Sequence, residues 1–207
     1  MLVNLTVKEF LAKTAGNEPV PGGGSIAALN AAIAAALAEM VANLTIGKKK
    51  YEDKEEVMKE IASVASKYQQ GFIKDIDADS DAYNEVFAAF KLPKETDEEK
   101  AKRSKQIQAA TKVAAEVPME VARKAFALMD FIARVAEEGN QNAITDACVS
   151  MMTARTAVLG AILNVKINLS SIKDEEYVKH MTKEISCLER AAIEKEHDLL
   201  NKVNKML

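Results

Sequence analysis

PVPGGGS, at residues 19–25, directly precedes the alanine-rich run IAALNAAIAAALAEM at residues 26–40, and this stretch decides the fold. The two prolines keep the approach rigid, whereas the glycines allow backbone angles that other residues avoid, so we expect a tight turn. Ser25 stands where a helix N-cap would stand, and the helix is predicted to run to about Ile46, with Gly47 as its stop. Free backbone amides at its start favour an anion or a polar ligand atom.

A glycine turn before a helix is compatible with two roles, a simple flexible turn or a ligand site. The turn lacks the Lys-Ser/Thr ending of a phosphate-binding P-loop. Its glycine spacing also differs from the dinucleotide fingerprint. The turn alone therefore leaves both roles open.

The composition indicates an all-α protein. The 207 residues include no Trp and few aromatics, and Ala, Lys, Glu and Leu are abundant. This is the usage of helical proteins, so we expect one domain, residues 1–207, built as a multihelical bundle around the central Ala-rich helix. That helix is long enough to cross a bilayer, but Asn30, Glu39 and Asn43 interrupt it, which favours a buried core helix.

Charge and cysteine content exclude several classes of function. The net charge is -3, from 28 basic and 31 acidic residues spread along the chain, so we expect no nucleic-acid or membrane partner. Cys148 and Cys187 lack the spacing of metal ligands, which favours two reduced, buried thiols. No signal peptide is visible at the N-terminus, and we therefore expect a cytoplasmic protein.

Helix signals divide the rest of the chain. Capping boxes predict helix starts at Thr6–Glu9 and Thr96–Glu99, and apolar periodicity predicts a helix from about Asp53 to Ala89. Pro118 is either a kink in the helix that follows Thr96 or the first residue of another helix. The last helix, about Asp174–Lys205, is amphipathic.

An acidic run, DIDADSD at residues 75–81, lies inside one predicted helix. Four carboxylates at this spacing repel one another, so a solvated acidic face and an inward-turned carboxylate are the two interpretations. Asp79 and Tyr83 are four residues apart and share a helix face. The composition alone favours the solvated face.

A lysine cluster and two pairs of asparagines can each be interpreted as structural or as functional. Lys48, Lys49 and Lys50 are either a solvated turn at a helix C-terminus or an attractor for a polyanionic ligand tail. The asparagines 140, 142, 164 and 168 fall near predicted helix ends, where caps and turns are the usual role.

Several of these motifs together resemble the cyclodeaminase/cyclohydrolase family of tetrahydrofolate enzymes. The resemblance rests on PVPGGGS with its alanine-rich helix, DSDAY at 79–83, GNQN at 139–142 through Asp146, and NVKIN at 164–168. LPK at 92–94 and VP at 117–118 lie between them. The match covers nearly the whole chain.

The resemblance implies a multihelical fold, a homodimer or an assembly of dimers, and a folate site near the glycine turn. The first expected reaction converts 5-formimidoyl-tetrahydrofolate to 5,10-methenyl-tetrahydrofolate with loss of ammonia. The alternative hydrolyses that methenyl bridge to 10-formyl-tetrahydrofolate. No formimidoyltransferase domain is fused to these residues, so the first reaction would need a separate formimidoyltransferase. An alternative of another class is a non-catalytic folate-binding or scaffold bundle.

We expect an acid-base site because either reaction moves protons at nitrogen or water. Asp79 is the preferred carboxylate, Tyr83 shapes its pocket, and Asp146 is the second choice. Predicted substrate-binding residues are Gly22, Gly23, Gly24, Ser25, Lys48, Lys49, Lys50, Asn140, Asn142, Asn164 and Asn168. The lysines would attract a polyglutamylated tail. We expect no metal and no cofactor beyond the tetrahydrofolate substrate.

Overall fold

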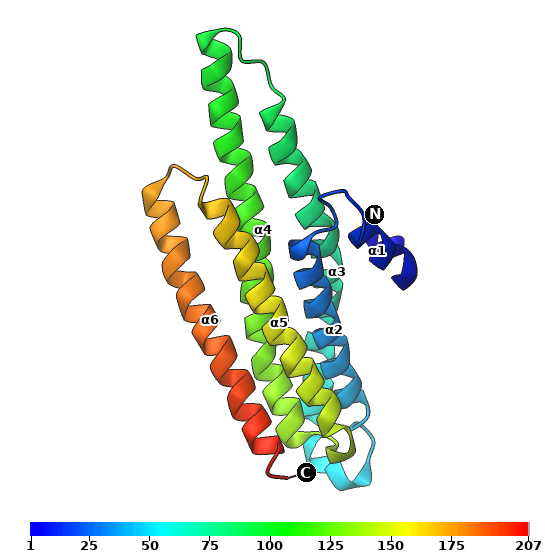
Figure 1. Cartoon of the computed structure of the whole chain (residues 1–207). Coiled ribbons are helices and arrows are strands. Elements are labelled where there is room, and N and C mark those ends of the chain that lie inside the picture. The colour runs from blue at the N-terminus through cyan, green and yellow to red at the C-terminus, as the bar shows by residue number, and fades with distance from the viewer. Residues whose placement is uncertain (207) are drawn as a thin grey trace.

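The structure, a computed structural model, describes residues 1–206 as a bundle of long helices with no β-strand in that range (Figure 1). This confirms the predicted all-α class. The elements in chain order are η1 Leu2–Asn4, α1 Val7–Thr14, α2 Gly23–Asn43, η2 Lys49–Lys54, α3 Glu55–Phe90, α4 Asp97–Glu138, η3 Gln141–Ala143, α5 Ile144–Leu169 and α6 Glu175–Val203.

Helix α2 is a core helix of the bundle: one face packs against α3, α4 and α5, and the other carries exposed side chains such as Ile33. Its inner face is almost entirely alanine, which lets the neighbouring backbones approach closely. The buried alanines are Ala27, Ala28, Ala31, Ala32, Ala34, Ala35, Ala38 and Ala42. The prediction of a central Ala-rich helix is therefore confirmed.

The start of α2 corrects two details of the sequence analysis. Gly22 is the N-cap and Ser25 is the third helical residue, so the prediction that Ser25 caps the helix is wrong. Gly47 is the sole glycine with a positive φ among residues 1–206, so the three glycines do not serve a left-handed turn. Gly23 and Gly24 instead leave space for neighbouring side chains from other helices.

Helices α3 and α4 form a long antiparallel hairpin. Both predicted capping boxes are present, at Thr6 and at Thr96. Helix α4 runs through the buried Pro118 without a break, so Pro118 does not begin a separate helix. The tip of the hairpin extends beyond the neighbouring ends of α5 and α6 (Figure 1).

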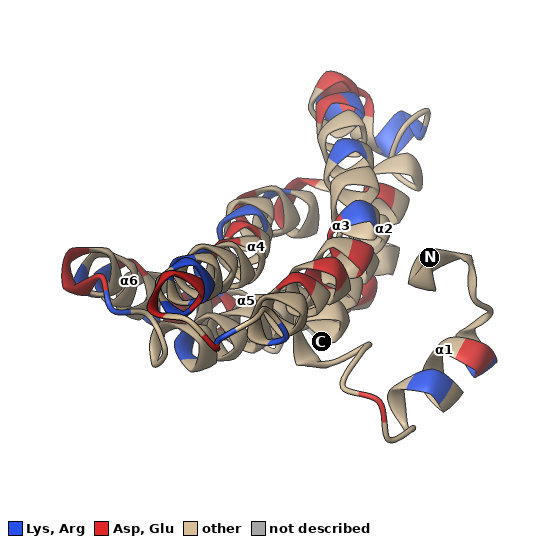
Figure 2. Ribbon diagram, turned by 90° about the horizontal axis from the view of Figure 1, so that it is seen from above, with Lys and Arg blue, Asp and Glu red and all other residues tan. Residues whose placement is uncertain are grey.

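Two segments, Gly23–Asn43 and Gln141–Leu169, are long and apolar enough to cross a membrane by length and composition. About half of each segment is buried inside the bundle, where they form the core helices α2 and α5. Both basic and acidic residues appear on α3, α4 and α6 when the bundle is seen from above (Figure 2). The outer helices therefore carry mixed charge, as the sequence predicted.

Candidate active site

A polar cavity of about 340 Å³ lies where α2 begins. The turn before α2 forms one wall, and α3, α4 and α5 form the others. It is lined by Pro19, Val20, Gly22, Gly23, Gly24, Asp79, Tyr83, Val86, Ala114, Asn164, Ile167 and Asn168. Three motifs that are far apart in the sequence thus meet in one place.

Asp79 is the one carboxylate in this cavity. Its Oδ2 accepts a hydrogen bond of 3.2 Å from Ser25 Oγ, and the Ser25 backbone amide also donates to the carboxylate. Ser25 Oγ lies 2.9 Å from the Ile76 carbonyl oxygen and 3.2 Å from Ser80 Oγ. Because Gly22 provides no side-chain cap, the Asp79 carboxylate supplies the negative group that the N-terminus of α2 favours.

The surroundings of Asp79 act on its protonation in two directions. Burial raises the pKa of the Asp79 carboxyl, and the two hydrogen bonds from Ser25 oppose this rise. The net direction is upward, which brings the carboxyl closer to the range where it can both accept and donate a proton near neutral pH. The structure favours the interpretation of an inward-turned carboxylate within the acidic run.

Glycine is needed beside Asp79 for space. A Cβ on Gly24 would overlap the Asp79 carboxylate, and a Cβ on Gly23 would lie 3.1 Å from Asn164 Nδ2. These contacts place the backbone of α2 directly against two side chains that line the cavity. The glycines thus let the helix start approach whatever the cavity holds.

The two asparagines of α5 are held by their amide nitrogens. Asn164 Nδ2 donates to the Gly160 carbonyl at 2.8 Å, and Asn168 Nδ2 donates to the carbonyls of Ala114 and Asn164 at 3.0 and 2.9 Å. Neither Oδ1 atom accepts a hydrogen bond from any residue in the described range 1–206. Two fixed acceptors therefore remain free at the cavity for a ligand N–H.

Tyr83 stands at the edge of the cavity, with 41% of its surface exposed. Its ring stacks on Phe87 with centroids 6.5 Å apart. The spacing of Asp79, Tyr83 and Val86 along α3 is the i, i+4, i+7 pattern of one helix face. This confirms that Asp79 and Tyr83 share a face.

The other predicted site residues lie at the opposite end of α2. Its 21 residues span about 30 Å, and Lys48, Lys49, Lys50, Asn140, Asn142 and Asp146 all follow or neighbour its far end. Asn140 is buried there, with its backbone amide bonded to Thr45 Oγ1 at 2.8 Å and its Nδ2 bonded to the Leu44 carbonyl at 3.2 Å. Within one chain the structure does not bring these residues to the cavity.

Sequence reasoning missed six contributors to the cavity and its support: Pro19, Val20, Ser80, Val86, Ala114 and Ile167. All but Val86 and Ala114 lie inside motifs quoted for the resemblance, so those motifs could have pointed to them. Val86 continues the helix face of Asp79, and this periodicity was the available signal. Ala114 carries no chemical signal in the sequence.

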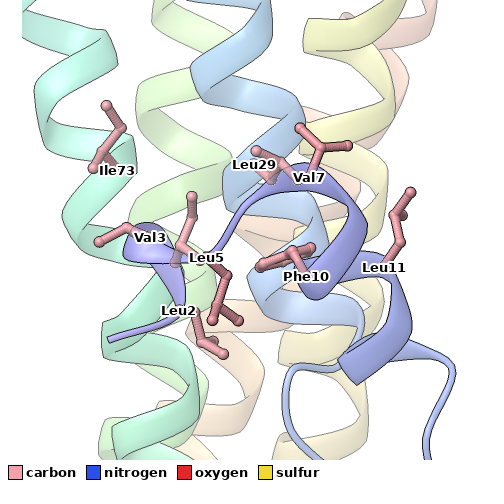
Figure 3. A pocket seen from close by; sticks show the side chains of 9 residues that line it. Leu2, Val3, Leu5, Val7, Phe10, Leu11, Leu29 and Ile73 are labelled. Atoms are coloured by element: carbon pink, nitrogen blue, oxygen red, sulfur yellow. The ribbon is translucent and has the colours of Figure 1, made fainter.

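A second cavity, of about 240 Å³, lies between the N-terminal segment and the helices α2 and α3. Its walls are apolar side chains, including Leu5, Phe10, Leu29 and Ile73 (Figure 3). No lining residue offers a charged or amide group for a polar ligand. The cavity at Asp79 brings together a carboxylate and two free amide oxygens, and we take it as the candidate active site.

Residues 6–187 match the protein family described as formiminotransferase-cyclodeaminase. The chain belongs to this family. The resemblance that the motifs carried is thereby confirmed, and the protein is an enzyme of the cyclodeaminase/cyclohydrolase type in tetrahydrofolate one-carbon metabolism.

Members of the family with different domain arrangements resemble this chain. Methenyltetrahydrofolate cyclohydrolase of Methylorubrum extorquens is 39% identical over 91% of this chain and 90% of that protein. Formimidoyltransferase-cyclodeaminase of Gallus gallus is 35% identical over 85% of this chain but only 32% of that protein. The crystal structure of formiminotetrahydrofolate cyclodeaminase from Thermotoga maritima superimposes with a TM-score of 0.88 at 31% identity, covering 100% of this chain and 99% of that one.

Proposed function

We propose that the cavity at Asp79 binds a tetrahydrofolate derivative and that the protein hydrolyses 5,10-methenyl-tetrahydrofolate to 10-formyl-tetrahydrofolate. The observation that carries the site is the half-buried Asp79 carboxylate between the start of α2 and two free asparagine oxygens. The choice of reaction is supported by the cyclohydrolase of Methylorubrum extorquens, which aligns along nearly its full length. On this ground we prefer hydrolysis to the cyclodeaminase reaction, which was the first expectation from the sequence.

In this mechanism Asp79 acts as the acid-base group. The methenyl bridge is a cation shared between two nitrogens, and an ionised carboxylate stabilises it and takes a proton from the attacking water. The C–O bond forms and gives a tetrahedral carbon. The same carboxyl then returns the proton to N5 as the C–N5 bond breaks. The hydroxyl on the carbon loses its proton to solvent and becomes the carbonyl of the formyl group on N10, so one proton is released overall. Tyr83 packs at the edge of this centre.

Asn164, Asn168 and the amides of Gly22, Gly23 and Gly24 bind the substrate in this proposal. The free Oδ1 atoms can accept the N–H groups of a pterin ring, and backbone amides can donate to its carbonyl oxygen. The roles predicted for Asp146, Asn140, Asn142 and the three lysines stay predictions, since one chain alone leaves them at the far end of α2.

The second candidate reaction is the cyclodeamination. It is supported by the Thermotoga maritima cyclodeaminase, which covers nearly the same length of chain. Here N10 attacks the formimidoyl carbon on N5 and its proton passes to the imine nitrogen. Asp79 delivers a second proton to that nitrogen, and the bond between it and the carbon breaks to release ammonia. A separate formimidoyltransferase would supply the substrate. Both reactions pass through a tetrahedral carbon between the same nitrogens, so one site serves either.

We further propose that the enzyme works in the cytoplasm without a cofactor beyond its folate substrate. The proton transfers above need only the carboxylate and water. Cys148 is buried and Cys187 is exposed, and both are free thiols, which fits a reducing compartment.

We propose a homodimer that pairs through the outer faces of α2 and α5. Several larger apolar residues of both helices are exposed on the outer faces, including Ile33 (43% exposed), Leu163 (64%) and Ile167 (69%). Such an exposed apolar face is typical of a subunit interface. Because Ile167 also lines the cavity, this interface would adjoin the active site.

Sedimentation of the wild type and of Ile33→Glu tests the dimer. A dimeric wild type and a monomeric, folded variant are expected. A monomeric wild type at micromolar concentration would contradict the proposed interface.

The reaction is tested by following the absorbance of the methenyl bridge. An accelerated loss of 5,10-methenyl-tetrahydrofolate supports the hydrolase, whereas formation of that compound from 5-formimidoyl-tetrahydrofolate with release of ammonia supports the deaminase. Stoichiometric folate binding without turnover would instead favour a non-catalytic binding protein.

A further inference from the structure

The inner face of the α3–α4 hairpin continues above the active-site cavity. Phe90 follows Asp79 by 11 residues on α3, and Arg103 precedes Ala114 by 11 residues on α4. Eleven residues make about three helical turns, so each residue lies on the cavity-facing side of its helix, about 16 Å beyond the cavity. The hairpin tip that carries this surface is visible beyond the ends of α5 and α6 in Figure 1.

Arg103 joins the two helices at this level. Its Nε and Nη2 donate to the Phe90 carbonyl oxygen at 3.3 and 3.0 Å, and its guanidinium carbon lies 5.6 Å from the centroid of the Phe90 ring. These contacts fix the side chain and hold it on the hairpin. The Phe90 ring beside it is 52% exposed.

The charge of Arg103 is not neutralised by the protein. No carboxylate of residues 1–206 lies within ion-pair distance of it, whereas Arg123, Arg134 and Arg155 each pair with glutamates. Its Nη1 makes no hydrogen bond to the described part of the chain. A planar guanidinium with a free edge suits a carboxylate, which it can bind through two parallel hydrogen bonds.

The neighbouring Lys102 points to the other side of the hairpin. It lines a separate hollow with Glu85, Ala88, Leu92 and Gln106, away from Asp79. The two adjacent cations on α4 therefore face different surfaces. This gives a matched control within one turn of helix.

We propose that Arg103 binds a carboxylate of the glutamyl tail of the folate substrate, with Phe90 packed against the tail. The inference rests on the proposed function, which puts the pterin at Asp79. The separation along the hairpin is similar to the distance between the pterin edge and the glutamyl carboxylate of an extended folate. It assigns to Arg103 the role that the sequence analysis gave to Lys48, Lys49 and Lys50.

The test measures KM and, separately, the Kd of two ligands, 5,10-methenyl-tetrahydrofolate and the matching pteroate that lacks glutamate. Arg103→Gln is expected to weaken the glutamate-bearing ligand about tenfold, the loss typical of a charged hydrogen bond, and to leave the pteroate unchanged. Unchanged turnover of the pteroate also shows that the variant is folded. Lys102→Gln is expected to alter neither ligand.

Equal affinity of wild type and Arg103→Gln for both ligands would overturn the inference. The inference would also be overturned if only the triple variant Lys48→Gln, Lys49→Gln, Lys50→Gln lost affinity for the glutamate-bearing ligand. Failure of the proposed function is seen separately, as a wild type that binds both ligands but converts neither. In that case a glutamate-dependent loss of binding in Arg103→Gln would still support the tail site.

Discussion

The two ends of α2 hold similar polar residues in opposite conditions. At its start, the oxygens of Asn164 and Asn168 accept no hydrogen bond from the described chain and face a cavity. At its far end, three polar groups of Asn140 are used: its Oδ1 accepts the Asn142 amide at 3.2 Å, and its two nitrogens donate to Leu44 and Thr45, directly after α2. A polar residue is available to a ligand only where packing leaves one of its atoms free.

Each end of α2 also has one candidate carboxylate, Asp79 at its start and Asp146 near its far end. Asp79 is turned inward beside the α2 amides, and burial raises its pKa. Asp146 lies in the first turn of α5 at the other end of the bundle. The comparison predicts that the chemistry belongs to the Asp79 end, and three pairs of variants and one single variant sharpen or break it.

The largest effect is expected for the two carboxylates. Asp79→Asn should lower kcat at least about 100-fold, the usual contribution of a general acid-base group, whereas Asp146→Asn should retain near wild-type kcat. The measurement is the steady-state rate of change of methenyl absorbance. Comparable losses in the two variants would break the contrast between the ends.

A stability control accompanies this pair. The pKa of Asp79 is raised in the folded state, so folding disfavours the ionised carboxylate. The folded protein therefore loses stability as the pH rises from the pKa of Asp79 in the unfolded chain through its pKa in the folded protein. Asp79→Asn should therefore melt at or above the wild-type temperature at pH 7. A lower melting temperature would show that the lost activity reflects damage to the fold.

The second pair compares two glycines. Gly24→Ala would push a Cβ into the Asp79 carboxylate, and we expect a loss of roughly tenfold or more in kcat/KM with a destabilisation of about 1–3 kcal/mol. Gly47 has φ 74° and open space around it, so Gly47→Ala should cost about 1 kcal/mol of stability and no activity. Thermal unfolding and turnover of both variants provide the check, and a fully active Gly24→Ala contradicts the close approach.

The third pair compares asparagines. Asn164→Ala removes a free acceptor at the cavity and should raise KM about fivefold to tenfold with little change in stability. Asn140→Ala removes buried hydrogen bonds and should lower stability by about 1–3 kcal/mol with KM unchanged. Kinetics and chemical denaturation separate the two effects, and an increased KM for Asn140→Ala alone would reverse the assignment.

The smallest effect is a shift in the pH profile. The hydrogen bonds from Ser25 lower the pKa of Asp79, so Ser25→Ala should move the acidic limb of kcat/KM to higher pH, because the base form then appears later. At a fixed pH on that limb, kcat/KM of Ser25→Ala should be about threefold lower than that of the wild type. A limb that stays in place, or moves to lower pH, would separate Ser25 from Asp79.

Local signals in the sequence were enough to predict much of the fold. The boxes at Thr6 and Thr96 cap helices because each is complete within four residues. The shared face of Asp79 and Tyr83 also follows from spacing within one helix. Such features depend on neighbours along the chain and are readable without tertiary structure.

The features that sequence reasoning missed depend on contacts between helices. Gly24 is needed because α3 brings Asp79 against it, which no local pattern reveals. Ser25 lies inside α2 because a carboxylate from another helix caps α2 in its place. The separation of Asn140 from Asn164 follows from the antiparallel course of the bundle, although both fall in motifs of the same family resemblance.

The most direct test of the account is a crystal structure of the protein with 5-formyl-tetrahydrofolate, a stable folate of the same shape. We predict difference density for the pterin between Asp79 and Asn164, with its tail directed along the α3–α4 hairpin toward Arg103. Density for the pterin beside Asn140 and Asp146, at the far end of α2, would contradict the central claim.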